Sequence, residues 1–241
     1  MSNGISELNF GALAAERERD FLSTNFIDSG AYHAIKGGGK IILLGHRGTG
    51  KTAILTVMAE ENLEKGNIVI ELSPEDYAYE LLSETLPREG AGAWHKYGAY
   101  AAAWKYLLYV LSMKHIVKAK SGFKTGPAKR IYHYVRDHHK NIDLNPIGAL
   151  ISYLKRLEGV KIGKFEASIK AKELHSLYKL EEIKNLLGDL NKVCERQNVF
   201  IIIDELDRGW DASEDAIAFV AGLFQASTSV SLIGQKKASK K

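Results

Sequence analysis

The chain has 241 residues, a formal net charge of +4 and a single cysteine, Cys194. Its hydrophobic content of 45% and charged content of 26% are ordinary for a globular protein and argue against an extended disordered chain. One cysteine excludes an internal disulfide, and the first residues lack the basic and apolar segments of a signal peptide. The most apolar window, residues 97–113, is interrupted by Lys105, which favours a buried helix over a membrane span. We therefore expect a cytoplasmic protein without a membrane role.

The first expected elements, in chain order, are a helix and a strand. Residues 10–26 carry apolar residues near helical spacing and predict an N-terminal helix, which Ser29-Gly30 is expected to end or bend. Three glycines at 37–39 lead into an apolar run at residues 41–44. That run is typical of a buried parallel strand.

The next segment, residues 45–52, reads GHRGTGKT and fits the P-loop pattern G-x-x-x-x-G-K-[ST]. Its glycines let the backbone curl so that successive N–H groups point into one anion-sized concavity. The N-terminus of the following helix adds partial positive charge. Lys51 would reach the β- and γ-phosphates, and the Thr52 hydroxyl would ligate Mg²⁺. The predicted nucleotide contacts are Gly45, His46, Arg47, Gly48, Thr49, Gly50, Lys51 and Thr52.

After the P-loop, residues 53–65 predict a helix stopped by Gly66, and residues 68–72 predict a short strand closed by Ser73-Pro74. The order strand, P-loop, helix, strand is the opening of a doubly wound α/β domain.

The long middle stretch, residues 75–197, is predicted to be mainly helical. Two apolar stripes recur every three or four residues, as the buried faces of helices do. The stripes are Trp94, Tyr97, Tyr100, Trp104, Leu107, Leu108 and Leu111, then Leu174, Leu177, Leu180, Ile183, Leu186, Leu187, Leu190 and Val193. Residues 159–171 are less regular and predict a hairpin or a short loop.

Within this stretch, residues 114–140 are strongly basic. Eight lysines and arginines are opposed there only by Asp137. They are Lys114, Lys118, Lys120, Lys124, Lys129, Arg130, Arg136 and Lys140. Because Phe123, Tyr132 and Tyr134 are interleaved with them, two interpretations stay open: a solvated helical face, or a surface for nucleic acid or another polyanion. The histidines in the segment have no recognisable metal-ligand spacing.

A second motif follows the basic middle. Residues 199–203 are a continuous apolar run that ends in Asp204 and Glu205. An acid at the carboxyl end of such a strand holds Mg²⁺, directly or through water, in P-loop enzymes. The alternative is a buried strand that ends in solvated acids. Glu205 would orient or polarise the attacking water, which favours an ATPase over a kinase, since an acceptor molecule brings its own hydroxyl. Lys51 and Glu205 are thus the catalytic candidates, and Thr52 and Asp204 the metal ligands.

The last expected helix runs from about residue 211 to residue 226, because Asp211-Ala212-Ser213-Glu214 has capping-box spacing. The expected fold is therefore an α/β P-loop NTPase core with a parallel sheet and a large helical insertion. Residues 1–74 hold the N-terminal helix and the P-loop half. Residues 75–197 form the insertion, and residues 198–241 hold the Walker B strand, its helix and a basic tail.

On these motifs the chain resembles bacterial P-loop ATPases of the AAA+/STAND–KAP broad group. The resemblance rests on the P-loop, on Asp-Glu-Leu-Asp-Arg at 204–208, and on residues 10–18, where Phe-Gly and Ala-Ala-Glu-Arg-Glu match a helix ahead of the P-loop. It implies an ATP-driven switch that uses ATP and Mg²⁺, in a group often linked to defence against phage or other mobile elements. ATP is favoured over GTP, since the guanine-reading Asn-Lys-x-Asp motif does not occur in the sequence.

The chain departs from this group after the last helix. The resemblance implies a further strand with a polar sensor residue, an arginine that completes the site, and a helical lid. Residues 228–233 are expected to begin such a strand, but no arginine follows Arg208. Since an arginine on the transferring phosphate contributes about 10³ or more in rate, a truncated chain or an arginine from a partner or second copy would explain this ending. A hydrolysing ATPase, a binding-only nucleotide switch, a nucleic-acid-binding module with a secondary ATP site and a P-loop kinase stay open.

Overall fold

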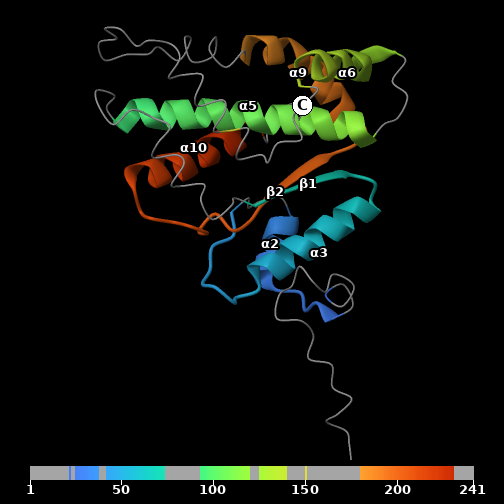
Figure 1. Cartoon of the computed structure of the whole chain (residues 1–241). Coiled ribbons are helices and arrows are strands. Elements are labelled where there is room, and N and C mark those ends of the chain that lie inside the picture. The colour runs from blue at the N-terminus through green and yellow to red at the C-terminus, as the bar shows by residue number, and fades with distance from the viewer. Residues whose placement is uncertain are drawn as a thin grey trace, which may run out of the picture. The chain divides into compact units, whose positions relative to one another are not determined.

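The computed structural model describes Leu22, Leu150 and residues 25–37, 42–73, 93–119, 125–139 and 180–230 (Figure 1). The chain divides into two compact units, residues 1–69 and 70–241, and the division falls within strand β1 (Ile68–Leu72). β1 pairs with β2 (Val199–Ile203) in a parallel sheet that has two strands in the described part of the chain. The structure is thus mixed helix and strand, as predicted, with a smaller sheet than expected.

Unit 1 contains a short helix that sequence reasoning missed. Helix α2 (Gly30–Lys36) begins at Ser29, whose Oγ accepts a hydrogen bond from the backbone N–H of Tyr32 at 3.2 Å. Ser29-Gly30 was predicted to end or bend the preceding helix, and residues 26–29 are indeed not helical. Ser29 also starts a new helix, because serine is a strong N-cap. The helix expected over residues 10–26 lies almost wholly outside the described residues.

Helix α3 (Lys51–Glu64) confirms the helix predicted after the P-loop. It packs against α2 through a small apolar cluster in which Tyr32, Ile54 and Val57 are buried. Phe26 meets the edge of the Tyr32 ring, with 5.1 Å between the ring centroids. This packing fixes the helix that begins at the end of the P-loop.

The prediction of a strand at residues 41–44 is wrong for its described residues, 42–44. Residues 42–46 are not part of a strand, and Leu44 is 85% exposed. A buried parallel strand needs neighbours on both edges and cover on both faces, whereas the sheet in the described residues consists of β1 and β2. The apolar run alone could not show whether those neighbours exist.

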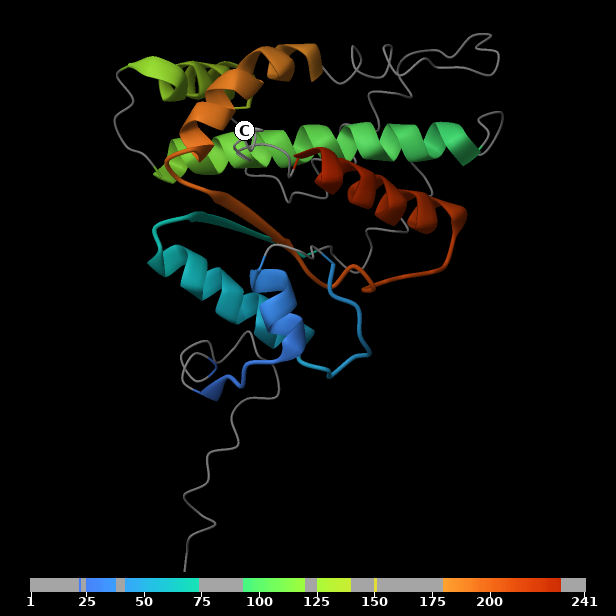
Figure 2. The ribbon, with the colours of Figure 1, turned by 180° about the vertical axis from the view of Figure 1, so that it is seen from behind.

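Unit 2 is built on two helices, α5 (Ala93–Ala119) and α10 (Glu214–Val230), which lie against each other (Figure 2). Trp104 is fully buried between them, and its Nε1 donates to the Phe219 carbonyl oxygen at 3.1 Å. Tyr100 donates its hydroxyl to buried Asp215 at 3.2 Å. The aromatic stripe predicted for α5 is therefore confirmed as core at Tyr100, Trp104, Leu107, Leu108 and Leu111, which are all buried, whereas Tyr97 is only partly buried.

Two more helices pack on α5 and on each other: α6 (Gly126–His138) and α9 (Leu180–Cys194). Arg130 on α6 forms a two-pronged ion pair with buried Asp189 on α9, with 2.6 Å between Nε and Oδ2. In the described part of residues 75–197, these helices and α5 confirm the predicted helical character. The hairpin or loop predicted at residues 159–171 lies outside the described residues. No helix in the described ranges combines the length and apolar character that crossing a membrane requires.

Both ends of α10 differ from the prediction. Ser213 caps the helix, because its Oγ accepts from the backbone N–H of Ala216 at 3.1 Å. Asp211 instead accepts from the backbone N–H of Ser213 at 3.0 Å, a hydrogen bond that lowers the pKa of Asp211. The helix continues to Val230, so residues 228–230 are not the start of a strand. Residues 231–233 lie outside the described part.

Candidate functional site

The P-loop segment of unit 1 is a tight turn at the start of α3. Gly48 and Gly50 have φ of 82° and 80°, in the left-handed region that favours glycine. Thr49 holds the turn closed, since its backbone N–H and its hydroxyl both donate to the His46 carbonyl oxygen, at 3.3 Å and 2.8 Å. Gly45 lies so close that a Cβ there would be 2.7 Å from Thr49 Oγ1. The sequence thus produces a tightly curled backbone just before α3.

Lys51 is folded back onto this turn. Its Nζ donates to the carbonyl oxygens of Gly45 at 2.8 Å and His46 at 3.0 Å. The ammonium group therefore sits over the concave side of the turn, at the first residue of α3. A phosphate bound at this helix start would compete with the two carbonyl oxygens for the lysine.

The start of α3 is suited to an anion in another respect. The N-cap is Gly50, which has no side chain to accept from the N–H groups of the first turn. Those groups and the helix dipole attract negative charge. No acidic residue lies in the first turn to compete for them. His46 and Arg47, the remaining predicted contacts, are exposed beside the turn.

The acidic motif lies in unit 2, where β1 and β2 end side by side. The Asp204 backbone N–H donates to the Leu72 carbonyl oxygen at 3.0 Å, which extends the pairing of the strands by one step. Asp204 Oδ1 in turn accepts from the backbone N–H of Glu205 at 2.8 Å. Glu205 has φ of 56°, an uncommon value for a residue other than glycine. Such backbone conformations cluster at functional sites.

The Glu205 carboxylate is held by two neighbours that sequence reasoning did not find. Ser73 Oγ, at the end of β1, donates to Glu205 Oε2 at 2.6 Å. Arg208 Nη1 donates to the same oxygen at 3.1 Å. The serine could have been found from the sequence, because it follows β1 as Asp204 follows β2, and the ends of paired parallel strands are neighbours. Both hydrogen bonds go to Oε2, and the Glu205 side chain is partly exposed.

The structure brings the predicted residues together in two groups. Gly45–Thr52 form one turn in unit 1, and Asp204 and Glu205 form another in unit 2 with Ser73 and Arg208. The first group belongs to unit 1 and the second to unit 2.

The predicted magnesium ligands are a hydroxyl, Thr52, and a carboxylate, Asp204. Both are hard oxygen donors, which Mg²⁺ prefers, and Mg²⁺ at phosphates is often held by only one or two protein groups. In the described ranges, no group of three or more His, Cys, Asp and Glu side chains could hold a metal ion. Each of the two side chains, within its own unit, is thus a donor of the kind that Mg²⁺ prefers.

The basic segment is less positive in the fold than along the chain. Arg130 is paired with Asp189, and Arg136 with Asp137, with 2.7 Å between Arg136 Nε and Asp137 Oδ1. Asp189 comes from a different helix, so counting acids within residues 114–140 missed it. Lys120, Lys124 and Lys140 lie outside the described residues.

Comparison of the chain with protein-family models, curated proteins and solved structures finds no significant match.

Proposed function

We propose that the chain is a Mg²⁺-dependent P-loop ATPase that binds ATP at residues 45–52 and acts as a nucleotide-driven switch. The observation that carries the proposal is the P-loop turn itself. Two left-handed glycines and the Thr49 hydrogen bonds curl the backbone at the start of a 14-residue helix. This is the arrangement that binds phosphate through backbone N–H groups.

In this proposal Lys51 changes partners when ATP binds. Its ammonium leaves the Gly45 and His46 carbonyl oxygens and pairs with the β- and γ-phosphates. Charge-assisted hydrogen bonds to phosphate are about twice as strong as neutral ones, so the exchange favours the bound state. Thr52 and Asp204 would hold Mg²⁺, which would neutralise the charge that develops on the phosphate oxygens.

Glu205 is the proposed general base. A carboxylate near a water accepts its proton as the water attacks, and such catalysis contributes about 10² to 10⁴ in rate. Ser73 and Arg208 fix one oxygen of Glu205, which leaves the other to receive the proton. Fixing a catalytic group in this way reduces the entropy lost in reaching the transition state.

Nucleotide binding is tested with Lys51→Ala, measured by calorimetric titration with ATP and Mg²⁺. We expect ATP affinity to fall about 10- to 100-fold, the usual effect of losing a charge-assisted hydrogen bond. Lys65→Ala, at the other end of the same helix, is the matched control and should bind ATP as the wild type does. Equal affinities for the two variants would rule out the phosphate role of Lys51.

Hydrolysis is tested with Glu205→Gln, measured as steady-state phosphate release. We expect turnover to fall about 10² to 10⁴-fold with ATP affinity unchanged. Asp207→Asn, an exposed acid in the same turn, controls for the loss of charge. Unchanged turnover in Glu205→Gln would remove Glu205 as the base.

The second candidate is a binding-only nucleotide switch, favoured by the ion pair between Arg208 and Glu205. In this candidate the arginine keeps the carboxylate engaged, so that the carboxylate does not act on a water. This candidate predicts ATP affinity without hydrolysis above background in the wild type, together with measurable hydrolysis in Arg208→Gln. Steady hydrolysis by the purified wild-type chain would exclude it.

A further inference from the structure

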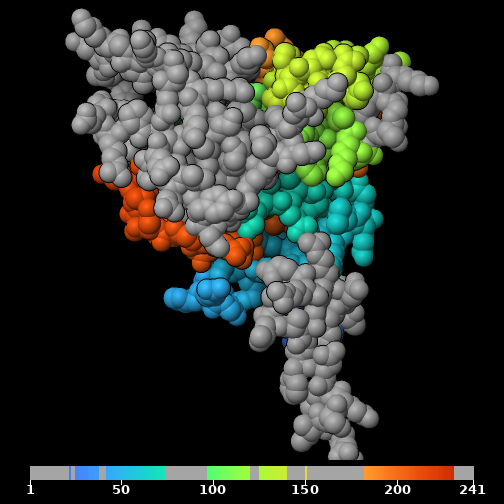
Figure 3. Space-filling view, viewed as in Figure 1, coloured from blue at the N-terminus to red at the C-terminus, as the bar shows by residue number. Residues whose placement is uncertain are grey.

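Helix α6 presents an outward face that the proposed ATPase function does not use. One side of the helix carries Lys129, Tyr132, His133 and Arg136, because the last three follow Lys129 by three, four and seven residues. The opposite side carries Ile131 and Val135, which are buried. Figure 3 shows α6 on the molecular surface (yellow-green).

The aromatic groups on this face are open and closely spaced. Tyr132 is 38% exposed, and its ring and the His133 ring form a T-shaped pair with 5.7 Å between the ring centroids. The Arg136 guanidinium lies 6.0 Å from the centroid of the Tyr132 ring, within the range of a cation–π contact. An exposed tyrosine flanked by an imidazole and a guanidinium offers a surface on which a planar ring can stack.

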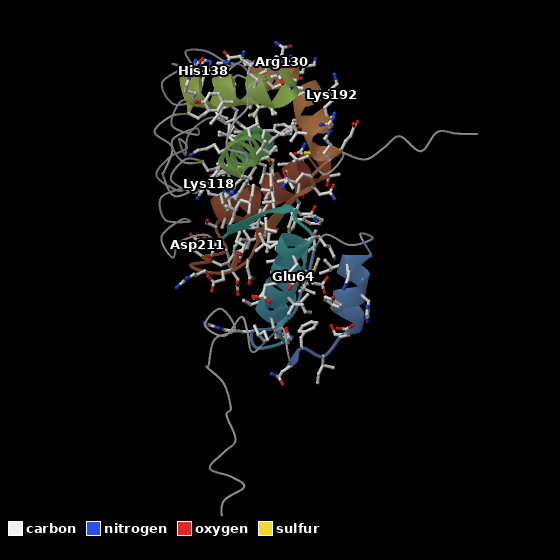
Figure 4. The ribbon with its side chains drawn as sticks, turned by 90° about the vertical axis from the view of Figure 1, so that its right-hand side faces the viewer. Glu64, Lys118, Arg130, His138, Lys192 and Asp211 are labelled. Atoms are coloured by element: carbon white, nitrogen blue, oxygen red, sulfur yellow. The ribbon has the colours of Figure 1, made fainter. Side chains whose placement is uncertain are left out.

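Further cations lie on the two helices that pack against α6. Lys114 and Lys118, near the end of α5, lower the pKa of His115 through their charge, although burial of His115 lowers it more. α5 packs against α6 in unit 2. The ion pair between Arg130 and Asp189 anchors α6 to α9, where Lys192 adds a further cation (Figure 4). A polyanion would therefore meet several cations on and beside this helix, of which Arg136 also pairs with Asp137.

We propose that the face formed by Lys129, Tyr132, His133 and Arg136 binds single-stranded nucleic acid. A base stacks on the Tyr132 ring, while Lys129 and Arg136 pair with phosphates on either side of it. The exposed ring selects a single strand, since the bases of a duplex are stacked on one another and do not offer their faces. A lipid surface would instead call for a broad apolar stripe along the helix, and this face has one aromatic ring between charged residues.

The experiment is fluorescence anisotropy of a labelled twenty-nucleotide oligo-dT with the full chain. We expect Tyr132→Ala to lower affinity about tenfold, as for the loss of one stacked base. Tyr132→Phe should keep wild-type affinity because it keeps the ring. Phe224→Ala on α10, with the same exposed fraction of 38%, is the matched control and should bind like the wild type. Thermal unfolding of each variant checks that the fold is kept.

Salt dependence separates phosphate pairing from stacking. Lys129→Gln should reduce the slope of log affinity against log salt by about 0.7, the value for one phosphate contact on a single strand. Tyr132→Ala should leave the slope unchanged. The double variant Arg136→Gln/Asp137→Asn keeps the net charge, so weaker binding by it would assign the guanidinium itself to the contact.

Three results would overturn the proposal: equal affinity for duplex DNA, wild-type binding by Tyr132→Ala, or binding to vesicles of anionic lipid that matches binding to oligo-dT. Lys51→Ala should bind oligo-dT as the wild type does. The proposal of ATP binding and the proposal of nucleic-acid binding can therefore fail independently of each other.

Discussion

The α5–α10 contact of unit 2 and the P-loop turn of unit 1 both require glycine, but for different physical reasons. Gly222 of α10 faces α5, and a Cβ there would lie 2.7 Å from Tyr100 Cβ and 2.8 Å from Ala101 N. Gly48 and Gly50 have nothing within 4 Å of an added Cβ, but their backbones are left-handed. One region requires glycine for space and the other for torsion, so the same substitution should harm them by different mechanisms.

The largest effect is expected for Gly222→Val. The added side chain must push α5 and α10 apart around buried Trp104, which we expect to reduce the free energy of unfolding by about 2 to 3 kcal/mol. Urea denaturation followed by tryptophan fluorescence measures the change. A valine variant as stable as the wild type would mean that the two helices do not approach so closely.

Gly50→Ala should have the next largest effect, through torsion rather than space. Holding alanine in the left-handed region costs about 1 to 2 kcal/mol, and we expect weaker ATP binding because the turn relaxes away from its curl. Gly50→Asn is the matched variant, since asparagine tolerates this region better than alanine. Calorimetric titration with ATP should rank the glycine first, asparagine second and alanine last. Equal binding by all three would show that torsion at this position is unimportant.

The sequence predicted those elements whose signals are local. β1 and β2 are apolar runs bounded by turn residues, such as Gly66 before β1. The core face of α5 followed from aromatic residues at helical spacing, and Tyr100 and Trp104 are fully buried. In each case the residues that decide the structure lie within a few positions of one another.

The sequence could not predict contacts between distant residues. Arg130 and Asp189, which form an ion pair, are 59 positions apart. No local pattern pairs them, because their approach depends on how whole elements pack. The strand predicted from the apolar run before the P-loop was wrong for the same reason. Whether Leu44 is buried depends on neighbouring strands, and it is 85% exposed.

A third glycine substitution, in α9, should have the opposite effect and increase the stability of the protein. Gly188 lies within α9 and is exposed, and a Cβ there would have nothing within 4 Å. Neither space nor torsion requires glycine at this position, so Gly188→Ala should stabilise the protein by about 1 kcal/mol through helix propensity. The same urea experiment measures it. Destabilisation would reveal a close contact on this face of α9.

The smallest effect concerns the contact between α2 and α3 in unit 1, in which a carboxylate takes part. The Glu61 carboxylate of α3 accepts from the Tyr32 hydroxyl and from Lys36 of α2, and it lies 3.4 Å from Lys65 Nζ. Burial alone would raise the pKa of Glu61, but the hydrogen bonds from Tyr32 and Lys36 outweigh it, so the pKa is lowered.

A pKa lowered by folding means that Glu61 stabilises unit 1 above the pKa of an unfolded glutamate, about 4.3, and that this contribution is lost as pH falls through the lower folded value. Amide hydrogen exchange in α2 and α3, corrected for its intrinsic pH dependence, should therefore show less protection between about pH 5 and pH 3. Glu61→Gln should flatten this change, whereas Glu64→Gln, an exposed acid one turn along the same helix (Figure 4), should not. The same profile in all three proteins would show that the α2–α3 contact depends on the apolar packing of Tyr32 against Ile54 and Val57 and not on the carboxylate.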